Sequence, residues 1–563
     1  MNEFVGYWGQ GDRAELENLL TKVSSDGNMR VGNQTDSCIW GIGGSKVSES
    51  GTIATISAGG LGDDAWVTVE ENCLILGREP FGRVPLYWTK QKQVIWFASR
   101  FQLLLAIAST PEVSIPALYG YSCFSYVPTP LTPVSGIFAV PAGVELIADI
   151  ESLPITRSQY QWREAPVLIK EEVKAIAQLQ TLLQQAVDRQ IADLSSSTEV
   201  GVFLSGGLDS ATVAALLVQA GIKVRAYSLD FGIEELSELP YAEKVAAHLS
   251  IPLVKVPANP TQIKKAITAT AAALDLPFGD GVTVPLYLLC QRASQEVGII
   301  FNGEGGDQLF AGWTNKPLIA AGVYNSLHPG GGENFTQQYL RTFHRLYGYE
   351  ARVWQGDVYQ QVKNINPQVW LDSALDANYC NSLLHRLRRA TLMLKGAQNI
   401  HPRATNLALA WDFKVRSPFC DLPLGEWTFQ LSGELCLQGA CEKYLLKRAV
   451  ESWLPGEIVW REKRGMGVPL TLWCLKELWP EVGKWLNPGM VRSGGRFVPD
   501  IAMKVIRGQL GGQIRGRRIG EILWLLMMWQ VWRRQVLGEA ATEKTLFSPF
   551  LLPSWWWKPP PEL

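Results

Sequence analysis

The sequence lacks the closely spaced cysteines of a disulfide framework or a zinc site. Its nine cysteines are odd in number and scattered, and no two of them form a CxxC pair. Disulfide-dense secreted domains and structural zinc sites both depend on such spacing. The first residues also lack a basic segment followed by an apolar stretch, so a secretory signal is not expected. A reducing, cytoplasmic location therefore fits best.

The chain also lacks an excess of either charge and a long apolar run. It has 52 lysines and arginines against 53 acidic residues, so no overall field attracts a nucleic acid or an anionic membrane. The most apolar late run, Ile522 to Trp532, is shorter than the roughly 20 residues that a membrane-spanning helix needs. We expect this run to be a buried helix, and we expect no nucleic-acid or membrane partner.

What is present indicates at least two hydrophobic cores. Residues 1–150 contain short β-type runs separated by Gly, Pro and Asn turns, which predict a β-rich domain. After a polar stretch at 151–166, strand and helix patterns alternate within 167–540, which predicts a parallel sheet covered by helices on both faces. Residues 313–406 are expected to form a helical subdomain inside it. In the Trp- and Pro-rich tail 541–563, the prolines argue against a regular element.

The strongest local signal is the segment SGGLDS, from Ser205 to Ser210, between an apolar strand and a helix. Glycines let a backbone approach an anion closely, and the N–H groups at the start of the helix attract negative charge. The segment is therefore predicted to be a phosphate loop. It is not of the Walker type, because no GK[ST] follows, so transfer of a terminal phosphate is not indicated.

A second glycine-rich segment, NGEGGDQLF from Asn302, also follows an apolar strand. Its carboxylates repel one another in a turn of flexible glycines, so a bound cation would compensate. Asp209 and Asp307 follow different strands and are expected to meet around a triphosphate. Magnesium suits this arrangement because it takes one or two carboxylates together with phosphate oxygens and water.

These motifs occur in an order that carries a family resemblance. SGGLDS and GEGGDQLFAGW are followed by RSPFCDLPL from Arg416, EKYLLKRAV from Glu442 and WREKRGMGVPL from Trp460, and the set resembles the synthetase domain of asparagine synthetases. REPFGRVPLYW from Arg78 and YVPTPLTPVSGIFAVPAG from Tyr126 resemble the class II glutamine amidotransferase domain that those enzymes carry.

The resemblance implies an α/β protein with two parts. The first is a β-rich domain of the N-terminal nucleophile hydrolase type. The second is a doubly wound parallel-sheet ATP-pyrophosphatase domain with a helical C-terminal part. The implied activity is that of an ATP-dependent carbon–nitrogen ligase that forms an acyl-adenylate and releases AMP and pyrophosphate. ATP and Mg²⁺ are the implied cofactors.

The resemblance also implies a role for each matching residue. The positions expected to line the nucleotide site are Leu204, Leu229, Asn302 and Gly303. The positions expected to hold pyrophosphate are Ser205, Gly206, Gly207 and Ser210, with Asp209 and Asp307 on magnesium. Lys463 matches a lysine that contacts the α-phosphate. Glu304 matches a glutamate that handles protons as the amine attacks, and support of the magnesium site is its alternative role.

Two departures from the family are equally informative. The family has a nucleophilic cysteine directly after the first methionine, whereas this chain has Asn2, and its HRGPD stretch appears here as Ser24 to Asn28. A carboxamide cannot supply the thiolate that glutamine hydrolysis needs. Lys414 stands where relatives commonly have an acidic residue that β-lactam-forming members use to deprotonate the amine. A β-lactam synthetase is therefore disfavoured, and the acceptor base stays unassigned.

Three functions remain open. The first is an amide ligase or macrolactam cyclase, similar to lasso-peptide cyclases, whose amine does not come from glutamine in this chain. Its carboxylate and amine substrates would be small molecules or peptides, with a precursor peptide or a partner protein as a further candidate. The second is an asparagine synthase that uses free ammonia. The third is a non-catalytic nucleotide-binding scaffold, against which the intact SGGLDS, both aspartates and Lys463 argue.

The substitution at position 2 predicts that the protein releases no glutamate from glutamine, because Asn2 has no thiol for acyl transfer. Incubation of the purified protein with glutamine, followed by a coupled glutamate assay, measures this directly. Asn2→Cys serves as the matched variant. Glutamate release by the wild type that disappears on mutation of Asn2 would contradict the prediction.

Overall fold

The computed structural model describes residues 3–11, 13–22, 29–35, 38–44, 52–70, 73–108, 110–149, 152, 154–195, 197–233, 237–312, 335–463, 465–511, 514–540 and 548–557. Asn2, Ser24 to Asn28 and the first part of the expected helical subdomain, 313–334, lie outside these residues.

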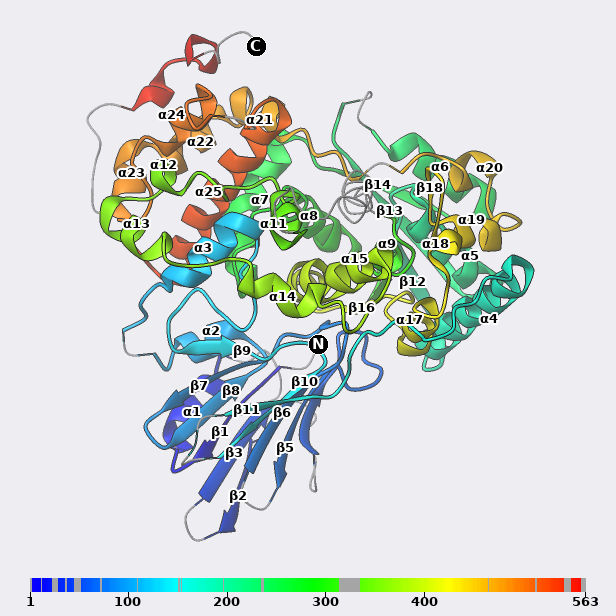
Figure 1. Cartoon of the computed structure of the whole chain (residues 1–563), viewed down its shortest axis with the longest axis horizontal. Helices are drawn as coiled ribbons and strands as arrows, with labels where there is room; N and C mark the ends of the chain where they lie inside the picture. Colours follow the sequence, from blue (N-terminus) through cyan, green and yellow to red (C-terminus); the bar gives the residue numbers. More distant parts are fainter. Residues whose placement is uncertain are drawn as a thin grey trace.

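The N-terminal part consists of two antiparallel sheets, as its turn-rich sequence predicts. One has the strand order β2-β3-β1-β8-β7-β9 and the other β11-β10-β6-β5-β4. The strands of the first are β1 (Phe4–Gly9), β2 (Met29–Thr35), β3 (Cys38–Gly44), β7 (Tyr87–Gln91), β8 (Val94–Ala98) and β9 (Ile137–Ala139). Those of the second are β4 (Thr52–Ile56), β5 (Ala65–Glu70), β6 (Cys73–Arg78), β10 (Val144–Ala148) and β11 (Ile155–Ser158). The sheets form the lower part of the molecule, with α1 (Arg13–Leu20) and α2 (Phe101–Leu105) beside them (Figure 1).

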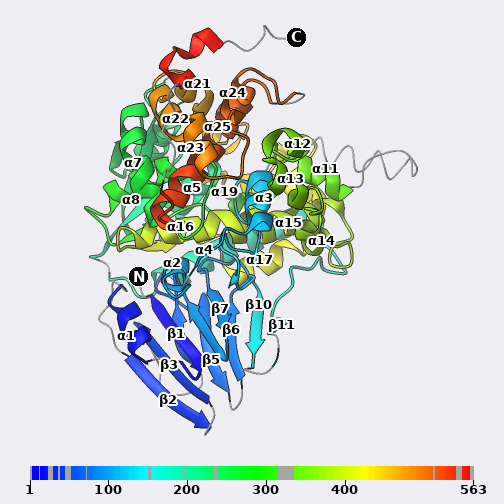
Figure 2. The same ribbon diagram turned by 90° about the vertical axis from the view of Figure 1, so that its left-hand side faces the viewer.

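One helix of the first 150 residues lies apart from these sheets. α3 (Ile115–Phe124) lies among helices from the C-terminal half of the chain (Figure 2). The Tyr121 hydroxyl donates a hydrogen bond of 2.8 Å to the Leu525 carbonyl, and the Tyr119 hydroxyl donates one of 2.8 Å to Glu350. The first 150 residues therefore contribute directly to the packing of the helical part.

The central part is a five-stranded parallel sheet with the order β14-β13-β12-β15-β16. Its strands are β12 (Glu199–Phe203), β13 (Lys223–Asp230), β14 (Leu253–Pro257), β15 (Ile299–Phe301) and β16 (Lys414–Arg416). The helices around it are α4 (Glu172–Ile191), α5 (Leu208–Gln219), α6 (Leu239–Leu249), α7 (Pro260–Ala273) and α8 (Thr283–Ala293).

Alternate residues of β13 show that both faces of this sheet are covered. Val224 and Ala226 join an apolar cluster with α5, whereas Tyr227 joins a second cluster with α7 and α8. The doubly wound fold expected from the alternating pattern is confirmed. The edge strand β16 was not expected, because three residues are too few to show a strand pattern.

The remaining described segments are helical. They are α9 (Gly306–Leu309), α11 (Phe335–Arg341), α12 (Glu350–Val353), α13 (Gly356–Val362), α14 (Val369–Leu375), α15 (Leu383–Thr391), the π-helix η2 (Leu392–Ile400), α16 (His401–Leu409), α17 (Leu422–Thr428), α18 (Gly433–Cys436), α19 (Tyr444–Val450), α20 (Gly456–Val459), α21 (Leu470–Leu475), α22 (Trp479–Leu486), α23 (Pro488–Ser493), α24 (Ile501–Ile506) and α25 (Arg517–Val536). A two-residue pair, β17 (Leu437–Gln438) and β18 (Cys441–Glu442), interrupts them. The run Ile522 to Trp532 is buried in α25, as expected. Within the described ranges, the search for a helix with the length and apolar composition of a membrane span finds none.

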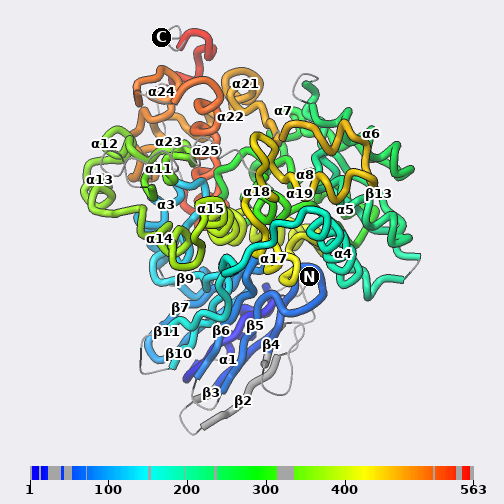
Figure 3. Tube along the Cα trace, turned by 45° about the vertical axis from the view of Figure 1, so that its right-hand side comes forward, coloured from blue at the N-terminus to red at the C-terminus, as the bar shows by residue number. Residues whose placement is uncertain are grey.

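The N-terminal sheets are fastened to the parallel sheet at its β16 edge. The buried Arg416 guanidinium donates to the Gly59 carbonyl at 2.9 Å and to the Asp193 carboxylate at 2.8 Å. The Val415 N–H donates to the Ala58 carbonyl at 3.1 Å. Nearby, α17 lies at the boundary between the two parts (Figure 3). The N-terminal part thus supplies backbone partners that β16 would otherwise lack.

The described part of the tail departs from the expectation of irregular structure. It forms two short 3₁₀ helices, η3 (Pro549–Leu551) and η4 (Ser554–Trp557). Proline suits the first position of a helical turn, because its missing N–H would have no partner there. The Trp557 indole donates to the Pro549 carbonyl at 3.0 Å and lies 4.4 Å from the Arg507 guanidinium. The neighbouring indoles of Trp555 and Trp556 are 63% and 61% exposed.

Candidate active site

The SGGLDS segment forms a loop at the carboxyl end of β12, directly before α5. Gly206 has a φ of +74°, and a Cβ there would lie 2.6 Å from the Ala242 nitrogen. Only glycine satisfies both demands without strain. The Gly207 N–H donates to the Ser205 hydroxyl at 3.2 Å, and Gly207 is the residue at the N-cap position of α5. The loop therefore directs backbone N–H groups and a helix N-terminus to the end of the sheet where ligands bind in such folds.

The second glycine-rich segment follows β15, which is the parallel neighbour of β12. Its glycines allow the two loops to touch. A Cβ on Gly306 would lie 2.5 Å from the Asp209 carboxyl carbon, and one on Gly303 would lie 2.7 Å from the Ser210 nitrogen. A Cβ on Gly312 would collide with the Lys443 side chain. These positions need glycine because the acidic side chains and a lysine pass directly over them.

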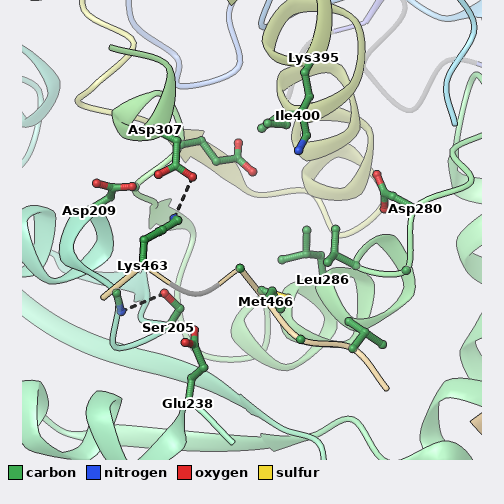
Figure 4. A pocket seen from close by; sticks show the side chains of 18 of the residues that line it. Ser205, Asp209, Glu238, Asp280, Leu286, Asp307, Lys395, Ile400, Lys463 and Met466 are labelled. Carbon is green, nitrogen blue, oxygen red and sulfur yellow. Dashed lines mark hydrogen bonds and ion pairs between the residues drawn. The ribbon is translucent and has the colours of Figure 1, made fainter. Parts of the chain in front are cut away.

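Asp209 and Asp307 converge on one buried ammonium group. Lys443 Nζ lies 2.6 Å from Asp209 Oδ1 and 2.5 Å from Asp209 Oδ2, and it also forms an ion pair with Asp307. Lys463 Nζ lies 2.9 Å from the other Asp307 oxygen (Figure 4). Lys443 precedes α19 in a left-handed conformation, with a φ of +55°. The predicted meeting of the two aspartates is thus present, with a lysine between them.

The ammonium groups control the charge of Asp307. Burial by itself would raise the pKa of the Asp307 carboxyl, but Lys443 and then Lys463 outweigh that effect and lower it. Burial would likewise lower the pKa of Lys443, yet Asp209 and Asp307 raise it. Asp307 and Lys443 are therefore ionised at neutral pH, which keeps Asp307 available as an oxygen ligand for a cation. Burial raises the pKa of the Asp209 carboxyl, and the ammonium group of Lys443 opposes that rise only in part.

Glu304 lies beside this cluster with a different protonation behaviour. Burial raises the pKa of its carboxyl to about 7, and Arg403 opposes the rise only in part. Asn302 holds the loop, because its side-chain oxygen accepts from the Ser417 hydroxyl at 2.6 Å and from the Glu304 N–H at 3.2 Å. A carboxyl that titrates near neutral pH can both accept and return a proton.

These groups line one cavity of about 860 Å³. The predicted site residues that line it are Leu204, Ser205, Gly207, Asp209, Ser210, Leu229, Asn302, Gly303, Glu304, Asp307 and Lys463. Gly206 is not among the lining residues, and its carbonyl instead accepts from Arg461 at 3.4 Å. The Leu204 side chain is buried in the core, so Leu204 presents only its backbone to the cavity.

Several residues that line the cavity carry no functional signal in the sequence. Lys443 lies in the EKYLLKRAV motif, but its position in the sequence does not predict that it contacts two distant aspartates. Arg461 stacks on Tyr241 at 3.8 Å and pairs with Glu238. On another wall lie Asp280, Lys395 and Arg403, from segments without a recognisable motif. Tertiary packing alone brings them to the site.

Lys414, the second departure from the family, does not line this cavity. It lies on β16, and a Cβ on Gly60 would come 2.9 Å from its ammonium nitrogen. The side chain therefore faces a loop of the N-terminal part. An acceptor base has to come from another residue.

The donor set fits Mg²⁺ bound together with a triphosphate. Among the residues that the structure describes, no cluster of three or more His, Cys, Asp or Glu side chains could hold a metal by itself. Asp209 and Asp307 offer carboxylate oxygens only, and Mg²⁺ completes such a pair with water and phosphate oxygens. Bound there, the ion would neutralise charge on the phosphates.

Comparisons with known proteins agree with this geometry. The asparagine synthase family matches residues 178–534, and the glutamine amidotransferase domain family matches residues 65–161. The glutamine-hydrolysing asparagine synthetase 1 of Bacillus subtilis is 24% identical over 438 residues, which are 72% of this chain and 67% of that protein. Asparagine synthetase 3 of the same organism is 22% identical over 70% of this chain and 65% of its own length. The chain spans about two thirds of each relative. An NH3-dependent NAD synthetase from Campylobacter jejuni matches 35% of this chain and 93% of its own at 17% identity, with a TM-score of 0.19, which is too low to support a shared fold by itself.

The position of Lys443 predicts a stability defect in Lys443→Met. The substitution leaves two carboxylates facing each other without their shared ammonium, and loss of one partner of a buried pair costs roughly 3 to 5 kcal/mol. Mg²⁺ should raise the melting temperature of this variant more than that of the wild type, because it replaces the missing charge. Differential scanning fluorimetry with and without Mg²⁺ measures both effects.

The matched control is Lys244→Met, which removes a surface pair with Glu457 whose side chains are 49% and 54% exposed. Such pairs contribute little, so this variant should melt as the wild type does. Equal melting temperatures for Lys443→Met and the wild type would show that the aspartates do not depend on Lys443.

Proposed function

The chain belongs to the asparagine synthase family, and we propose that it is an ATP-dependent amide ligase whose amine does not come from glutamine hydrolysis in this chain. The members it resembles are ATP-dependent ligases. The proposed reaction activates a carboxylate as an acyl-adenylate, releases pyrophosphate, and then transfers the acyl group to an amine with release of AMP.

The observation that supports adenylation is the convergence of the SGGLDS loop, two aspartates and two lysines in one cavity. The loop offers N–H groups to two adjoining phosphates, and it lacks the Walker lysine that assists transfer of the γ-phosphate. Ser205, Gly207 and Ser210 would bind the leaving pyrophosphate. Asp209 and Asp307 would hold Mg²⁺ against it.

Charge explains the role proposed for the lysines. A carboxylate that attacks the α-phosphorus brings two anions together, so cations at fixed positions must offset the repulsion. Two contacts hold Lys463 in place. Its backbone N–H donates to Glu442 at 3.1 Å, and its ammonium group donates to Asp307. It is therefore positioned before substrate arrives. Lys443 would share its positive charge with the triphosphate once Mg²⁺ engages the aspartates.

Glu304 is proposed to accept the proton that the attacking amine loses. When the new C–N bond forms, the bond between the acyl carbon and the AMP oxygen breaks, and the nitrogen must lose a proton. The carboxyl has a pKa raised to about 7, which matches this task at neutral pH. Lys414 cannot substitute for it, because it faces the N-terminal part.

The cavity favours an amide ligase or macrolactam cyclase over an ammonia-dependent asparagine synthase. Away from the phosphate loop, aromatic and aliphatic side chains make up much of the lining: Phe124, Tyr126, Phe231, Leu286, Leu289 and Phe343. Aspartate and ammonia offer no apolar surface for these side chains, whereas a peptide or a hydrophobic acid does. With Asn2 in place of the cysteine, the N-terminal part retains its proposed role as a cover for the β16 edge.

The phosphate chemistry predicts AMP and pyrophosphate as products, with no ADP. Asp307→Asn should abolish pyrophosphate release, because a neutral amide is a poor ligand for a hard cation. Lys463→Ala should leave nucleotide binding largely intact and slow turnover by roughly a hundredfold to a thousandfold, the usual cost of one transition-state charge partner. Exchange of labelled pyrophosphate into ATP, with a panel of candidate carboxylates, is the direct assay.

Lys244→Met is the control for this assay, since Lys244 forms only an exposed ion pair with Glu457. Carboxylate-dependent ADP as the main product would overturn the proposal. Equal pyrophosphate release by Asp307→Asn and the wild type would remove the role of Asp307 in holding the metal.

Glu304→Gln should separate the two half-reactions. Pyrophosphate exchange should continue, while amide formation falls by roughly a hundredfold to ten-thousandfold, the usual contribution of a general base. In the wild type, amide formation should decline as the pH falls through about 7, because Glu304 becomes protonated there. Pyrophosphate exchange should not share this decline. If both half-reactions fall equally in Glu304→Gln, the residue supports the metal site and is not the base.

A further inference from the structure

Among the described residues that line the cavity, one cation has no ion-pair partner. Lys395 lies on the π-helix η2, and its side chain is accessible because it projects into the cavity (Figure 4). In the part of the chain that the structure describes, no hydrogen bond or ion pair ends on its ammonium group. A π-helix is rare and occurs frequently at functional sites.

Every other lysine and arginine of the lining has a carboxylate within 4.0 Å. Arg403 pairs with Asp280 at 2.5 Å and Arg345 with Glu521 at 2.8 Å. The remaining pairs are Lys443 with Asp209, Lys447 with Glu442, Arg461 with Glu238, Lys463 with Asp307 and Arg517 with Glu521. Within the described ranges, each lysine and arginine of the lining other than Lys395 thus has a carboxylate as its counter-ion.

The acids whose charges act on Lys395, Asp307 and Asp280, are already engaged. Asp280 accepts from the Thr283 hydroxyl at 2.6 Å as well as from Arg403, and Asp307 is held by two lysines. Burial lowers the pKa of Lys395, and the attraction of Asp307 and Asp280 does not restore it. The ammonium group faces the cavity without a counter-ion among the described residues, so it is available to an anion that a ligand brings.

The phosphate loop lies away from Lys395. Lys395 and Ser205 lie on opposite sides of the cavity, and the side chains of Leu286, Ile400 and Met466 border the space between them (Figure 4). A ligand that extends from the phosphate loop to Lys395 therefore passes these apolar side chains. Its reacting carboxylate would lie near Lys463, which leaves Lys395 for a different group.

We propose that Lys395 binds a second carboxylate of the substrates, one that is not adenylated and that is separated from the reacting group by an apolar body. This inference rests on the proposed ligase function and names the substrate class for it. The second carboxylate belongs either to the acid that is activated or to the amine that attacks, and the chemistry of recognition is the same. A charge-assisted contact of this kind is short and strong in an enclosed site.

The test compares matched ligand pairs in the presence of Mg²⁺ and a non-hydrolysable α,β-methylene ATP. Suberate and octanoate differ only in the second carboxylate and probe the acid. 8-Aminooctanoate and octylamine differ in a carboxylate that an apolar chain separates from the amine, and they probe the acceptor. Isothermal titration calorimetry gives the affinity of each for the wild type, Lys395→Met and Lys395→Arg.

One of the two pairs should show about a tenfold or greater preference for the extra carboxylate in the wild type, as expected for one hydrogen bond to a charged group. Lys395→Met should lose that preference, and Lys395→Arg should keep most of it. The pair that responds identifies the substrate that carries the carboxylate. The thermal midpoint of Lys395→Met should match that of the wild type, because its ammonium group makes no described contact within the fold.

Absence of a carboxylate preference in the wild type for both pairs would overturn the inference, and so would a preference that Lys395→Met retains. Failure of the ligase proposal is recognised separately, because it appears as ADP formation or as an unaffected Asp307→Asn variant. Neither of those results depends on Lys395.

Discussion

The contact of Lys443 with Asp209 and Asp307 is the interaction on which the site depends. Adjacent parallel strands deliver the two carboxylates to the same edge of the sheet, where they would repel each other. A buried ammonium group between them removes the repulsion before any nucleotide arrives. The glycines of both loops follow from the same contact, since Gly306 and Gly312 leave the space that Asp209 and Lys443 occupy. Without ligands, the carboxylates of Asp209 and Asp307 are thus balanced by the Lys443 ammonium group. When ATP binds, Mg²⁺ can balance the two carboxylates, and the triphosphate can balance the ammonium group.

The edge of the parallel sheet explains why the N-terminal part persists without its nucleophilic cysteine. β16 leaves a buried guanidinium and a backbone N–H that need acceptors, and the carbonyls of Gly59 and Ala58 provide them. The strand ends one residue before Ser417, whose hydroxyl holds Asn302 in the second loop. The N-terminal part therefore stabilises the second loop through β16. This contact does not require the N-terminal part to hydrolyse glutamine.

The two sides of the cavity differ in character. The side formed by the loops after β12 and β15 is polar, and it is the side that we propose binds phosphate. The side formed by η2, α8 and the segment before α21 combines aliphatic and aromatic side chains with the unpaired Lys395. The first side suits a step common to the family. The second side has a different, largely apolar lining. We expect this side to determine which substrates bind.

The sequence by itself determined the layered fold, the phosphate loop and the pair of aspartates. Alternating strand and helix patterns and glycine-rich turns after apolar strands are local features, and parallel strands necessarily bring their carboxyl ends to one edge. The helix containing Ile522 to Trp532 was also predictable from its apolar run. Tertiary structure decided the rest. Strand β16 has the sequence KVR, with one apolar residue, and so shows no strand pattern. The tail turns contact residues far away in the sequence, Trp479 and Arg507. Lys443, Arg403 and Lys395 acquire their roles only by meeting residues more than a hundred positions away, or by meeting no partner at all. A lone cation in a sequence carries no information about its counter-ion, because long-range packing determines which charges meet.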